Sequence, residues 1–584
     1  MKILLVAVNA KYIHSNLAVY SLKSYAARYA DSIQIAELTI NHTEEEILKQ
    51  VYLHQADVVA FSCYIWNIDI IKRLSSELRK IQKKVKIWFG GPEVSYDAEH
   101  CLKQNPQLDG IMIGEGEQTF LEFAQYYVEG NIALKDIRGL AYRESALLSQ
   151  NQNDLTTEEK STITLTAERP PMNLDDIPFP YEDMEVFRNK IIYYESSRGC
   201  PFSCSYCLSS IDKRVRLRSS GLVKKELKLF LEYQVPQVKF VDRTFNCSRK
   251  HTMDIWSFIK ENDNGITNFH FEISADLLNE EEIDFLSTLR PGQVQLEIGV
   301  QSTNPDTVKA IHRQMDFGVL KKNVNRIQEG KNIHQHLDLI GGLPYEGYAS
   351  FERSFEDVYR LKPDQLQLGF LKVLKGSLMH IESDKYNIVY HDSAPYEVLS
   401  TMDLSYDEIL QLKGICDMVE VYYNSAQFTY SIQYLEHFYT SPMKLYRALS
   451  DYYELNGWAS IAHSRIRRFE ILLAFFQEIV LDGKEDCSEE VALFTEILVF
   501  DVFIREGMKA RPDFAPENPI QHKLRELYRS YETDRRMIHI EQFHYDVINS
   551  ARTGEVIKKT LTILFDYKNR DPLNKSARLV EIEG

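Results

Sequence analysis

Short apolar runs separated by stretches with helical spacing recur along the sequence, and this alternation limits the possible folds more than any other feature. The first five expected strands are residues 3–8, 33–38, 58–62, 86–89 and 110–113, and the expected helices among them are residues 17–29, 44–54, 68–80 and 119–128. The strand runs are apolar throughout, as in strands covered on both faces. Residues 1–140 are therefore predicted to form an open, doubly wound, Rossmann-like parallel sheet, with its ligand at the carboxyl ends of the strands.

A second series of strand and helix units follows a polar linker. Residues 141–188 form this linker, in which residues 162–166 are expected to pair with residues 139–142 as a small hairpin. The six expected strands are residues 191–195, 237–241, 268–273, 293–298, 336–340 and 365–371. Six such units predict a partial (β/α)6 barrel over residues 189–390, whose functional residues lie at the carboxyl ends of the strands.

The C-terminal region, residues 391–584, changes to longer helical stretches and a few alternating runs. The expected helices are residues 407–423, 434–453 and 465–481, and the expected strands are residues 538–545, 560–567 and 577–582. Its many aromatic side chains at helical spacing are interpreted as core, with a substrate-facing wall as the alternative. The predicted fold class is thus α/β, with a mainly helical α+β domain at the end that we expect to act as a lid or substrate domain.

Composition disfavours several classes of partner. The 584 residues carry a formal net charge of −17, which argues against tight nucleic-acid binding. No apolar stretch reaches the roughly 18 residues needed to cross a bilayer, and the apolar start at residues 3–8 is too short for a signal peptide. The eight cysteines show no paired framework, which favours a reducing compartment. We therefore expect a cytoplasmic protein without a membrane partner.

Three cysteines fall within eight residues directly after the first strand of the second series. They stand in Cys200-Pro-Phe-Ser-Cys204-Ser-Tyr-Cys207. Thiolates are soft ligands suited to iron–sulfur clusters and to zinc. A structural zinc site needs a fourth cysteine or histidine nearby, but no histidine follows within the next forty residues and Cys247 stands alone. The pattern favours an iron–sulfur cluster.

The C-x3-C-x2-C spacing, with an aromatic residue before the last cysteine, resembles the cluster loop of the radical S-adenosylmethionine (SAM) superfamily. The resemblance implies that Cys200, Cys204 and Cys207 hold a [4Fe–4S] cluster with one iron open to SAM, which one electron cleaves to a 5′-deoxyadenosyl radical. The runs "GVQS" at 299–302 and "D-x-I-x-G-L-P" at 338–344 resemble radical SAM barrels as well.

By the same resemblance, several further residues bind the cofactors of the barrel. Tyr206 would back the adenine, and Asp242 with Arg243 would lie near the SAM amino group and the cluster. The remaining expected residues are Glu272 and Gln301 at the ribose or methionine moiety, Gly341 and Gly342 close to adenine, and Ser302 as a further cofactor contact. The run 213–218, with four cations, is interpreted as a solvated face, with binding of an anionic substrate or the SAM carboxylate as the alternative.

The order of the motifs resembles the cobalamin-binding radical SAM proteins, because a sheet domain with "GGPE" and "GEGE" turns precedes the cysteine loop. The resemblance implies that Ser62, Gly90, Gly91, Pro92 and Glu93 line the corrin side of cobalamin, and that Gly114, Glu115 and Gly116 lie near its nucleotide tail. The sequence lacks the Asp-x-His-x-x-Gly motif that supplies a lower axial histidine elsewhere. His14 is interpreted as a surface or capping residue, so we expect cobalamin without a protein histidine on cobalt.

Together these resemblances imply an enzyme that uses a [4Fe–4S] cluster, SAM and cobalamin. The expected reaction is methylation of an unactivated carbon of a small molecule or peptide: a substrate radical takes methyl from methylcobalamin, and a second SAM restores the methyl group. A low-potential donor such as flavodoxin or ferredoxin would supply the electron. The alternatives are a ring-forming or rearranging enzyme with the same cofactors, and a cobalamin- or redox-sensing protein.

Overall fold

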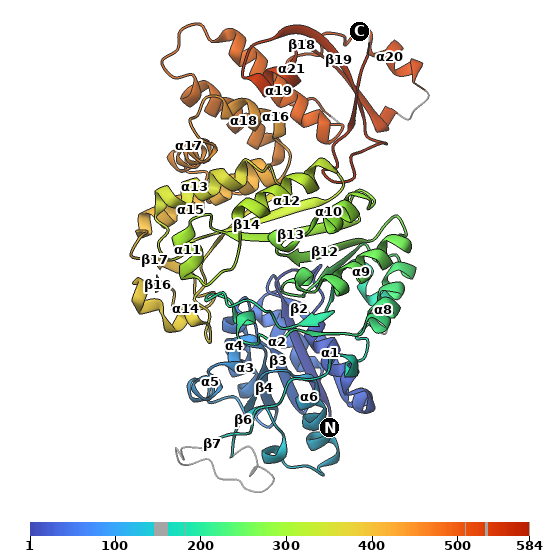
Figure 1. Cartoon of the computed structure of the whole chain (residues 1–584), viewed down its shortest axis with the longest axis vertical. Helices are drawn as coiled ribbons and strands as arrows, with labels where there is room; N and C mark the ends of the chain where they lie inside the picture. Colours follow the sequence, from blue (N-terminus) through green and yellow to red (C-terminus); the bar gives the residue numbers. More distant parts are fainter. Residues whose placement is uncertain (145–161, 182, 509, 532–534, 583–584) are drawn as a thin grey trace.

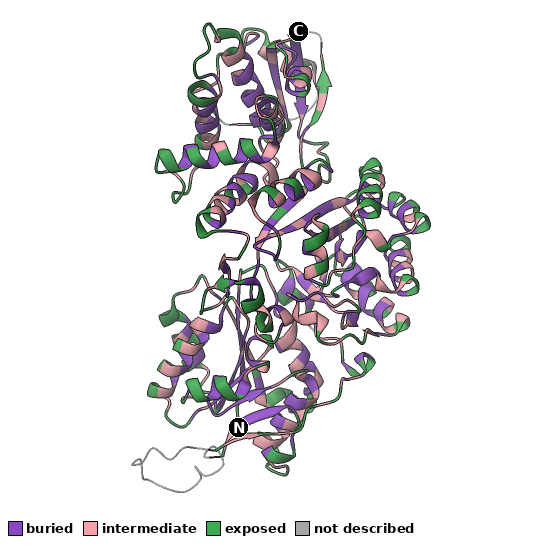
Figure 2. Cartoon of the chain, turned by 60° about the vertical axis from the view of Figure 1, so that its left-hand side comes forward, coloured by how far each residue is buried: buried purple, intermediate pink, exposed green. Residues whose placement is uncertain are grey.

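The computed structural model describes residues 1–144, 162–181, 183–508, 510–531 and 535–582. Figure 1 shows three parts that follow one another along the longest axis of the molecule: an N-terminal sheet with its helices, a second sheet with helices, and a mainly helical C-terminal part. In these parts the strands are mostly buried and the helices expose one side (Figure 2). In the described part of the chain, no helix is long and apolar enough to cross a membrane.

The N-terminal sheet has seven strands in the order β2-β1-β3-β4-β5-β6-β7. The strands are β1 (Ile3–Asn9), β2 (Ile33–Thr39), β3 (Val58–Ser62), β4 (Lys86–Gly90), β5 (Gly110–Met112), β6 (Leu140–Arg143) and β7 (Ile163–Leu165). The first five are parallel, and β6 and β7 add an antiparallel edge. This confirms the doubly wound sheet and the hairpin expected in the linker, which extends the sheet.

Helices cover both faces of this sheet, as its apolar strands require. They are α1 (Leu17–Tyr25), α2 (Glu44–Leu53), α3 (Ile68–Ile81), α4 (Pro92–Ser95), α5 (Ala98–Gln104) and α6 (Glu117–Glu129). The first helix is shorter than the expected 17–29, because a 3-10 segment at Ala27–Ser32 follows it. Two buried clusters, one on each face of the sheet, form the core of this part.

The second sheet has six strands in the order β15-β14-β13-β12-β11-β8, and every neighbouring pair is parallel. The strands are β8 (Ile192–Tyr194), β11 (Gln237–Phe240), β12 (Asn268–Ile273), β13 (Val294–Gln301), β14 (His334–Gly341) and β15 (Gln365–Phe370). Each expected strand is present. Among the described residues β8 and β15 are the two edges of the sheet and do not pair, so the barrel is open as expected.

The outer face of this sheet is covered by the helices that connect its strands. They are α8 (Ser220–Glu232), α9 (Arg249–Glu261), α10 (Glu280–Ser287), α11 (Pro305–Ala310), α12 (Phe317–Glu329) and α13 (Tyr348–Tyr359). A short two-stranded ribbon, β9 (Ser197–Arg198) with β10 (Arg216–Leu217), lies beside β8 and brackets the cysteine loop.

The C-terminal part combines helices with a three-stranded antiparallel sheet. The elements are α15 (Tyr406–Val419), α16 (Thr429–Glu436), α17 (Pro442–Leu455), α18 (Arg465–Phe475), α19 (Ser488–Arg505), β18 (Ile538–Tyr545), β19 (Lys558–Asp566) and β20 (Arg578–Glu581). The three expected strands are confirmed. Most of its tyrosines are buried, and Tyr422, Tyr434 and Tyr446 are among the largest fully buried side chains, as the core interpretation predicts.

One helix prediction in this region is wrong, and the longest helix of the region was missed. The expected helix at residues 434–453 is two helices, because Ser441 caps α17 and Pro442 occupies its first turn, where a proline is tolerated only at a helix start. The missed helix is α19, whose residues from Leu493 to Ile504 are nearly all buried. A helix that is apolar on all sides lacks the periodic pattern that marks an amphipathic helix.

Substitution of Gly110 should destabilise the N-terminal sheet. A Cβ atom at this buried position would lie 2.3 Å from the Trp88 ring and 2.8 Å from the Ala141 carbonyl oxygen, so strands β4 and β6 would have to move apart. Overpacking of this kind costs about 1–3 kcal/mol. We expect Gly110→Ala to lower the thermal unfolding midpoint measured by circular dichroism.

Gly221 provides the matched control. It is exposed in the first turn of α8, and nothing lies within 4 Å of a Cβ atom placed there. Alanine has the higher helix propensity, so Gly221→Ala should leave the midpoint unchanged or raise it. An unchanged midpoint for Gly110→Ala would contradict the close packing of β4, β5 and β6.

Candidate functional site

The carboxyl ends of the two parallel sheets face each other across one cavity of about 1180 Å3. Seven of the residues expected to hold cobalamin line it: Ser62, Gly90, Gly91, Pro92, Gly114, Glu115 and Gly116. The opposite wall comes from the second sheet and the cysteine loop and includes Glu195, Ser197, Arg198, Gly199, Leu208, Asp212, Arg216 and Arg243. The cavity is therefore shared by both sheets, at the strand ends where α/β folds bind ligands.

Two glycines of the N-terminal wall have conformations that other residues rarely adopt. Gly91 has φ of +113°, and a Cβ atom there would lie 2.5 Å from the Cys63 carbonyl oxygen. Gly114 has φ of +77° and open space around it. Their backbones can therefore approach a ligand closely, as glycine turns at such sites do.

Glu93 is placed differently from the rest of the GGPE turn. It does not line the cavity, and the hydroxyl of Tyr396 donates a hydrogen bond to its buried carboxylate. Lys375 lies 3.9 Å from the same oxygen. Burial raises the pKa of Glu93 above its ordinary value. Glu93 thus joins the N-terminal sheet domain to the segment after β15, and we do not assign it to the corrin side.

The cysteine loop is held in a tight turn beside the cavity. Gly199 has φ of +96°, and a Cβ atom there would lie 2.3 Å from the Arg214 carbonyl oxygen. The Cys200 amide donates to the Asp212 carbonyl over 3.1 Å. Cys200 and Cys204 are buried, Cys207 is partly buried, and all three are free thiols. Among the described residues, no group of three or more His, Cys, Asp or Glu side chains could hold a metal ion, so the cluster ligands stay a prediction.

Arg313 is a residue of this site that the sequence reasoning missed. Its Nη1 lies 4.0 Å from the Sγ of Cys204 and 3.5 Å from the hydroxyl of Tyr206. Burial alone would lower the pKa of Arg313, but Tyr206 and Cys204 raise it above its ordinary value. A permanent cation therefore stands beside the expected cluster ligands, where it would stabilise negative charge on sulfur. No motif surrounds it in the sequence that could have indicated this role.

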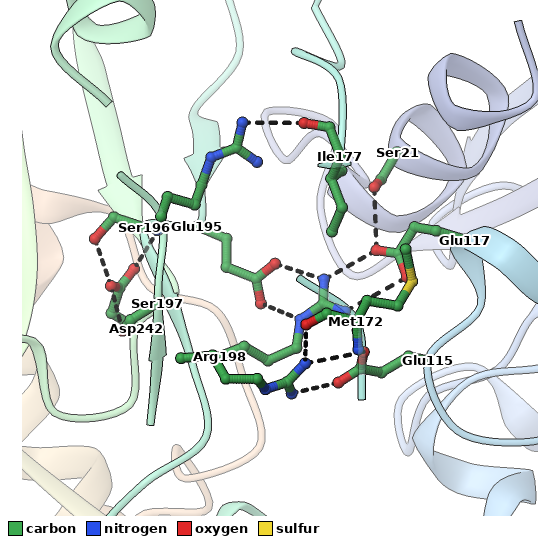
Figure 3. Close-up of polar contacts among 12 residues, drawn as sticks. Ser21, Glu115, Glu117, Met172, Ile177, Glu195, Ser196, Ser197, Arg198 and Asp242 are labelled. Carbon is green, nitrogen blue, oxygen red and sulfur yellow. Dashed lines mark hydrogen bonds and ion pairs between the residues drawn. The ribbon is translucent and has the colours of Figure 1, made fainter. Parts of the chain in front are cut away.

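Asp242 is engaged by the protein itself. Its fully buried carboxylate accepts hydrogen bonds from the Ser196 amide at 2.9 Å and from the Ser196 and Ser197 hydroxyls at 2.6 Å each (Figure 3). Burial raises the pKa of Asp242 to about 6, although these hydrogen bonds lower it. Because both oxygens have protein partners, we do not assign Asp242 a contact with SAM. The neighbouring Arg243 does line the cavity.

Glu272 and Gln301 keep polar atoms without protein partners. Within the described residues no hydrogen-bond donor contacts the Glu272 carboxylate, and burial raises its pKa to about 7. The buried Oε1 of Gln301 has no hydrogen-bond partner among the described residues, and its backbone has a φ of +72°. An unpaired buried polar atom is costly, so Gln301 fits the predicted contact with a polar ligand. Glu272 is only partly buried, and its carboxylate can accept a hydrogen bond from such a ligand.

Gly341 and Gly342, at the end of β14, are constrained by packing. A Cβ atom at Gly341 would lie 3.3 Å from the Phe370 ring, and one at Gly342, where φ is +87°, would lie 2.6 Å from Val398. These contacts explain both glycines without a ligand. The expected closeness to adenine therefore stays a prediction.

Charged side chains alternate along the inner face of the second sheet. Lys239 and His270 both lie 2.9 Å from Glu297, and His336 lies 3.1 Å from Asp338. Burial would raise the pKa of Glu297, but His270 and Lys239 hold it far below its ordinary value. Of these five residues the sequence reasoning named only Glu297 and Asp338, as polar residues near the ends of their expected strands. The alternation of polar residues within β11–β14 was the available signal for the others.

His14 contacts the second sheet. Its Nδ1 lies 2.9 Å from the Tyr193 hydroxyl, and burial lowers its pKa. It is partly buried and does not line the cavity. The structure thus gives His14 an interdomain contact and no role at the cavity.

The interpretation of residues 213–218 as a solvated face is wrong for its second half. Arg216 pairs with Glu115 through both guanidinium nitrogens, and its side chain is 18% exposed. Arg218, 6% exposed, donates to Glu226 and to the Ile177 carbonyl oxygen. Glu115 lies 101 residues from Arg216 and Glu226 lies 8 residues from Arg218, both outside the charge run, so the run alone did not indicate these ion pairs.

In a comparison with known protein families, three family models match successive parts of this chain. The model described as B12 binding domain matches residues 3–124, and that of the radical SAM superfamily matches residues 194–358. A third, described as protein of unknown function (DUF4080), matches residues 384–565. The chain combines a B12-binding domain with a radical SAM domain. The B12-binding domain is the N-terminal sheet domain, and the radical SAM domain contains the cysteine loop and most of the second sheet.

Three relatives illustrate the likeness. An uncharacterised methyltransferase of Pyrococcus horikoshii is 25% identical over 57% of this chain and 71% of its own length. The cobalamin-dependent radical SAM methyltransferase TokK of Streptomyces tokunonensis is 24% identical over 51% of this chain and only 44% of its own length. The cobalamin-bound structure of the cobalamin-dependent SAM radical enzyme OxsB has a TM-score of 0.57 at 15% identity, over 86% of this chain and 80% of that one. The last likeness shows a shared fold.

Ser302, expected as a cofactor contact, is fully buried against Glu346, and this pair should make the stability of the protein depend on pH. The hydroxyls of Ser302 and Ser354 donate to one oxygen of Glu346 at 2.7 and 2.8 Å, and the other buried oxygen has no partner among the described residues. Burial raises the pKa of Glu346 to about 7, although both serines lower it.

Because the pKa of Glu346 is higher in the folded protein than in the unfolded chain, the contribution of this residue to stability is greatest below about pH 4.5 and is lost as the pH rises through about 7. At roughly 1.4 kcal/mol per unit of pKa, the ionised carboxylate costs up to about 3 kcal/mol at high pH. Glu346→Gln should therefore raise the unfolding midpoint at pH 8 and leave it nearly unchanged at pH 5. Exposed Glu329→Gln is the control, and an equal effect at both pH values would contradict the raised pKa.

Proposed function

We propose that this protein is a cobalamin-dependent radical SAM enzyme that methylates an unactivated carbon of a small molecule or peptide. The observation that carries the proposal is the shared cavity, because the glycine turns of the B12-binding domain line one side and Gly199, Leu208 and Asp212, from the loop that contains the three cysteines, line the other. Two separate cofactor domains that open onto one space fit a reaction that uses both cofactors on the same substrate. The methyltransferase names of the Pyrococcus protein and of TokK support the reaction class.

Residues that line the cavity, and others in the second sheet and the cysteine loop that do not line it, fit the cofactors. When bound, the cluster and cobalamin would supply one-electron cleavage of SAM and a carrier for the methyl group. Gly91 and Gly114 allow close approach on the B12 side. On the other side Arg313 would compensate negative charge on the sulfur atoms, and the unpaired carboxylate of Glu272 would accept a hydrogen bond from a ribose hydroxyl. The burial of Cys200 and Cys204 would limit the access of water.

The cellular partners follow from the same chemistry. Reduction of a low-potential cluster requires an external electron donor such as flavodoxin or ferredoxin, and an oxygen-sensitive cluster requires a reducing compartment, which we propose is the cytoplasm. The mainly helical C-terminal part lies at the end of the molecule away from the N-terminal sheet (Figure 1), and among the described residues none after Arg243 lines the cavity, so we assign this part no role as a lid over the substrate. The loop at Asp403 in this part accepts a hydrogen bond from the Tyr345 amide, beside the loop that follows β14.

Product analysis tests the proposed reaction. Anaerobically reconstituted protein should convert SAM, in the presence of cobalamin and a low-potential reductant, to both 5′-deoxyadenosine and S-adenosylhomocysteine, measured by mass spectrometry. The matched control is the triple variant Cys200→Ala, Cys204→Ala and Cys207→Ala, which should reduce 5′-deoxyadenosine at least about 100-fold, because it loses the site of reductive cleavage.

The two products separate the alternatives. 5′-Deoxyadenosine without S-adenosylhomocysteine would contradict methyl transfer and favour a ring-forming or rearranging enzyme with the same cofactors. Neither product, with cluster and cobalamin fully loaded and a panel of small-molecule and peptide substrates supplied, would favour a cobalamin- or redox-sensing protein.

A further inference from the structure

The two ends of the cysteine loop are joined by a short antiparallel ribbon. In this ribbon Arg198 of β9 is the register partner of Arg216 of β10. The loop between them, residues 199–215, contains all three cysteines of the motif. Any displacement of these two arginines therefore moves both ends of the loop together.

Both arginines bind the GEGE turn of the B12-binding domain. Arg198 Nη2 donates to Glu117 over 2.9 Å and to Glu195 over 2.6 Å. Arg216 Nη1 donates to Glu115 over 3.1 Å, and its Nη2 binds the other oxygen of the same carboxylate. Glu115 also accepts a hydrogen bond from the Met172 amide at 3.0 Å. Figure 3 shows Arg198 beside Glu117, Glu195 and Glu115, between the two domains.

The four side chains are charged and little exposed. Arg198 is 22% exposed and Glu117 is 7% exposed at the side chain. Burial would raise the pKa of Glu117, but Arg198 holds it below its ordinary value. Burial would lower the pKa of Arg198, but Glu195 and Glu117 raise it well above its ordinary value. Ion pairs of this kind are sensitive to geometry, because removal of one partner leaves an uncompensated buried charge.

The same turn forms part of the wall of the cavity. Gly114, Glu115, Gly116 and Glu117 all line it, together with Arg198 and Arg216. At Gly116 the turn packs against α1, since a Cβ atom there would lie 2.9 Å from the side chain of Leu22. A ligand that fills the cavity on the B12 side therefore presses against the element that holds both ends of the cysteine loop.

We propose that Glu115, Glu117, Arg198 and Arg216 form a clamp that couples cobalamin binding to the arrangement of the cluster loop. This inference rests on the proposed function, and it assigns Glu115 a positioning role in place of the expected contact with the nucleotide tail. A cluster on Cys200, Cys204 and Cys207 fixes the conformation of the loop. Through their ion pairs, the two arginines at its ends then fix the position of the GEGE turn. Cobalamin binds more tightly to the turn so arranged, and by thermodynamic reciprocity it favours the loop arrangement that holds the cluster.

A pair of binding curves measures this coupling. The dissociation constant of hydroxocobalamin is determined anaerobically, by absorbance, for the full chain with its cluster reconstituted and for the same chain with the cluster removed. We expect cobalamin to bind the cluster-loaded wild-type protein at least about 5-fold more tightly, the lower end of typical coupling between two sites. In the double variant Glu115→Gln and Glu117→Gln, whose side chains keep their size, the ratio should fall to about 1.

Asp109→Asn is the matched control. Asp109 forms a comparable, partly buried ion pair with Arg79 within the B12-binding domain, 2.5 Å apart, and neither residue lines the cavity. This variant should keep the wild-type ratio even if its stability falls, which separates coupling from general weakening of the domain. If the double variant does not fold, the single variant Glu115→Gln should fold, since Arg216 retains Asp212 at 3.2 Å as a partner. This single variant should still lower the ratio, because it weakens the contact between Arg216 and the GEGE turn.

Each outcome decides the proposal. A wild-type ratio near 1, or a wild-type ratio that the glutamine variants keep, overturns the clamp while leaving cobalamin binding itself intact. Failure of the wild-type protein to bind hydroxocobalamin in either state overturns the proposed function and the clamp together. A ratio that falls in the glutamine variants but not in Asp109→Asn supports the clamp.

Discussion

The structure depends on one constraint of parallel sheets, which is that all strands deliver their carboxyl-terminal loops to the same edge. This chain contains two such sheets, and their loop edges face each other across a single cavity. The polar and glycine-rich loops that cannot pack inside either sheet therefore gather in one place. The interdomain contacts, from Lys190 with Glu37 to Tyr396 with Glu93, fix the two edges in this orientation.

The electrostatics of the interface follow from that arrangement. Loops rich in carboxylates from the B12-binding domain meet arginines that flank the cysteine loop, and each buried charge has an opposite charge beside it. On the side where SAM is expected, the buried Oε1 of Gln301 has no hydrogen-bond partner among the described residues.

The sequence was sufficient to predict the helices and strands that have a local pattern of apolar and polar residues. Both parallel sheets and the C-terminal strands were predictable, because continuous apolar runs alternate with helices or with turns. Pairings between distant segments were not predictable: Asp242 with Ser196, Glu93 with Tyr396, and Arg216 with Glu115 each join residues that no spacing rule relates. For the same reason Arg313 was missed, since only the fold brings it beside Cys204. The buried helix α19 was not predicted, because it has no polar face and therefore no amphipathic pattern.

The central claim is that one cavity brings the two cofactors together, and electron paramagnetic resonance tests it most directly. The protein is loaded with cob(II)alamin and the cluster, and the cobalt signal is recorded before and after reduction of the cluster to its paramagnetic state. The account predicts that the cobalt signal broadens and relaxes faster after reduction, and that the triple variant Cys200→Ala, Cys204→Ala and Cys207→Ala shows no such change. A cobalt signal that is identical before and after reduction, with both cofactors fully bound, would contradict it.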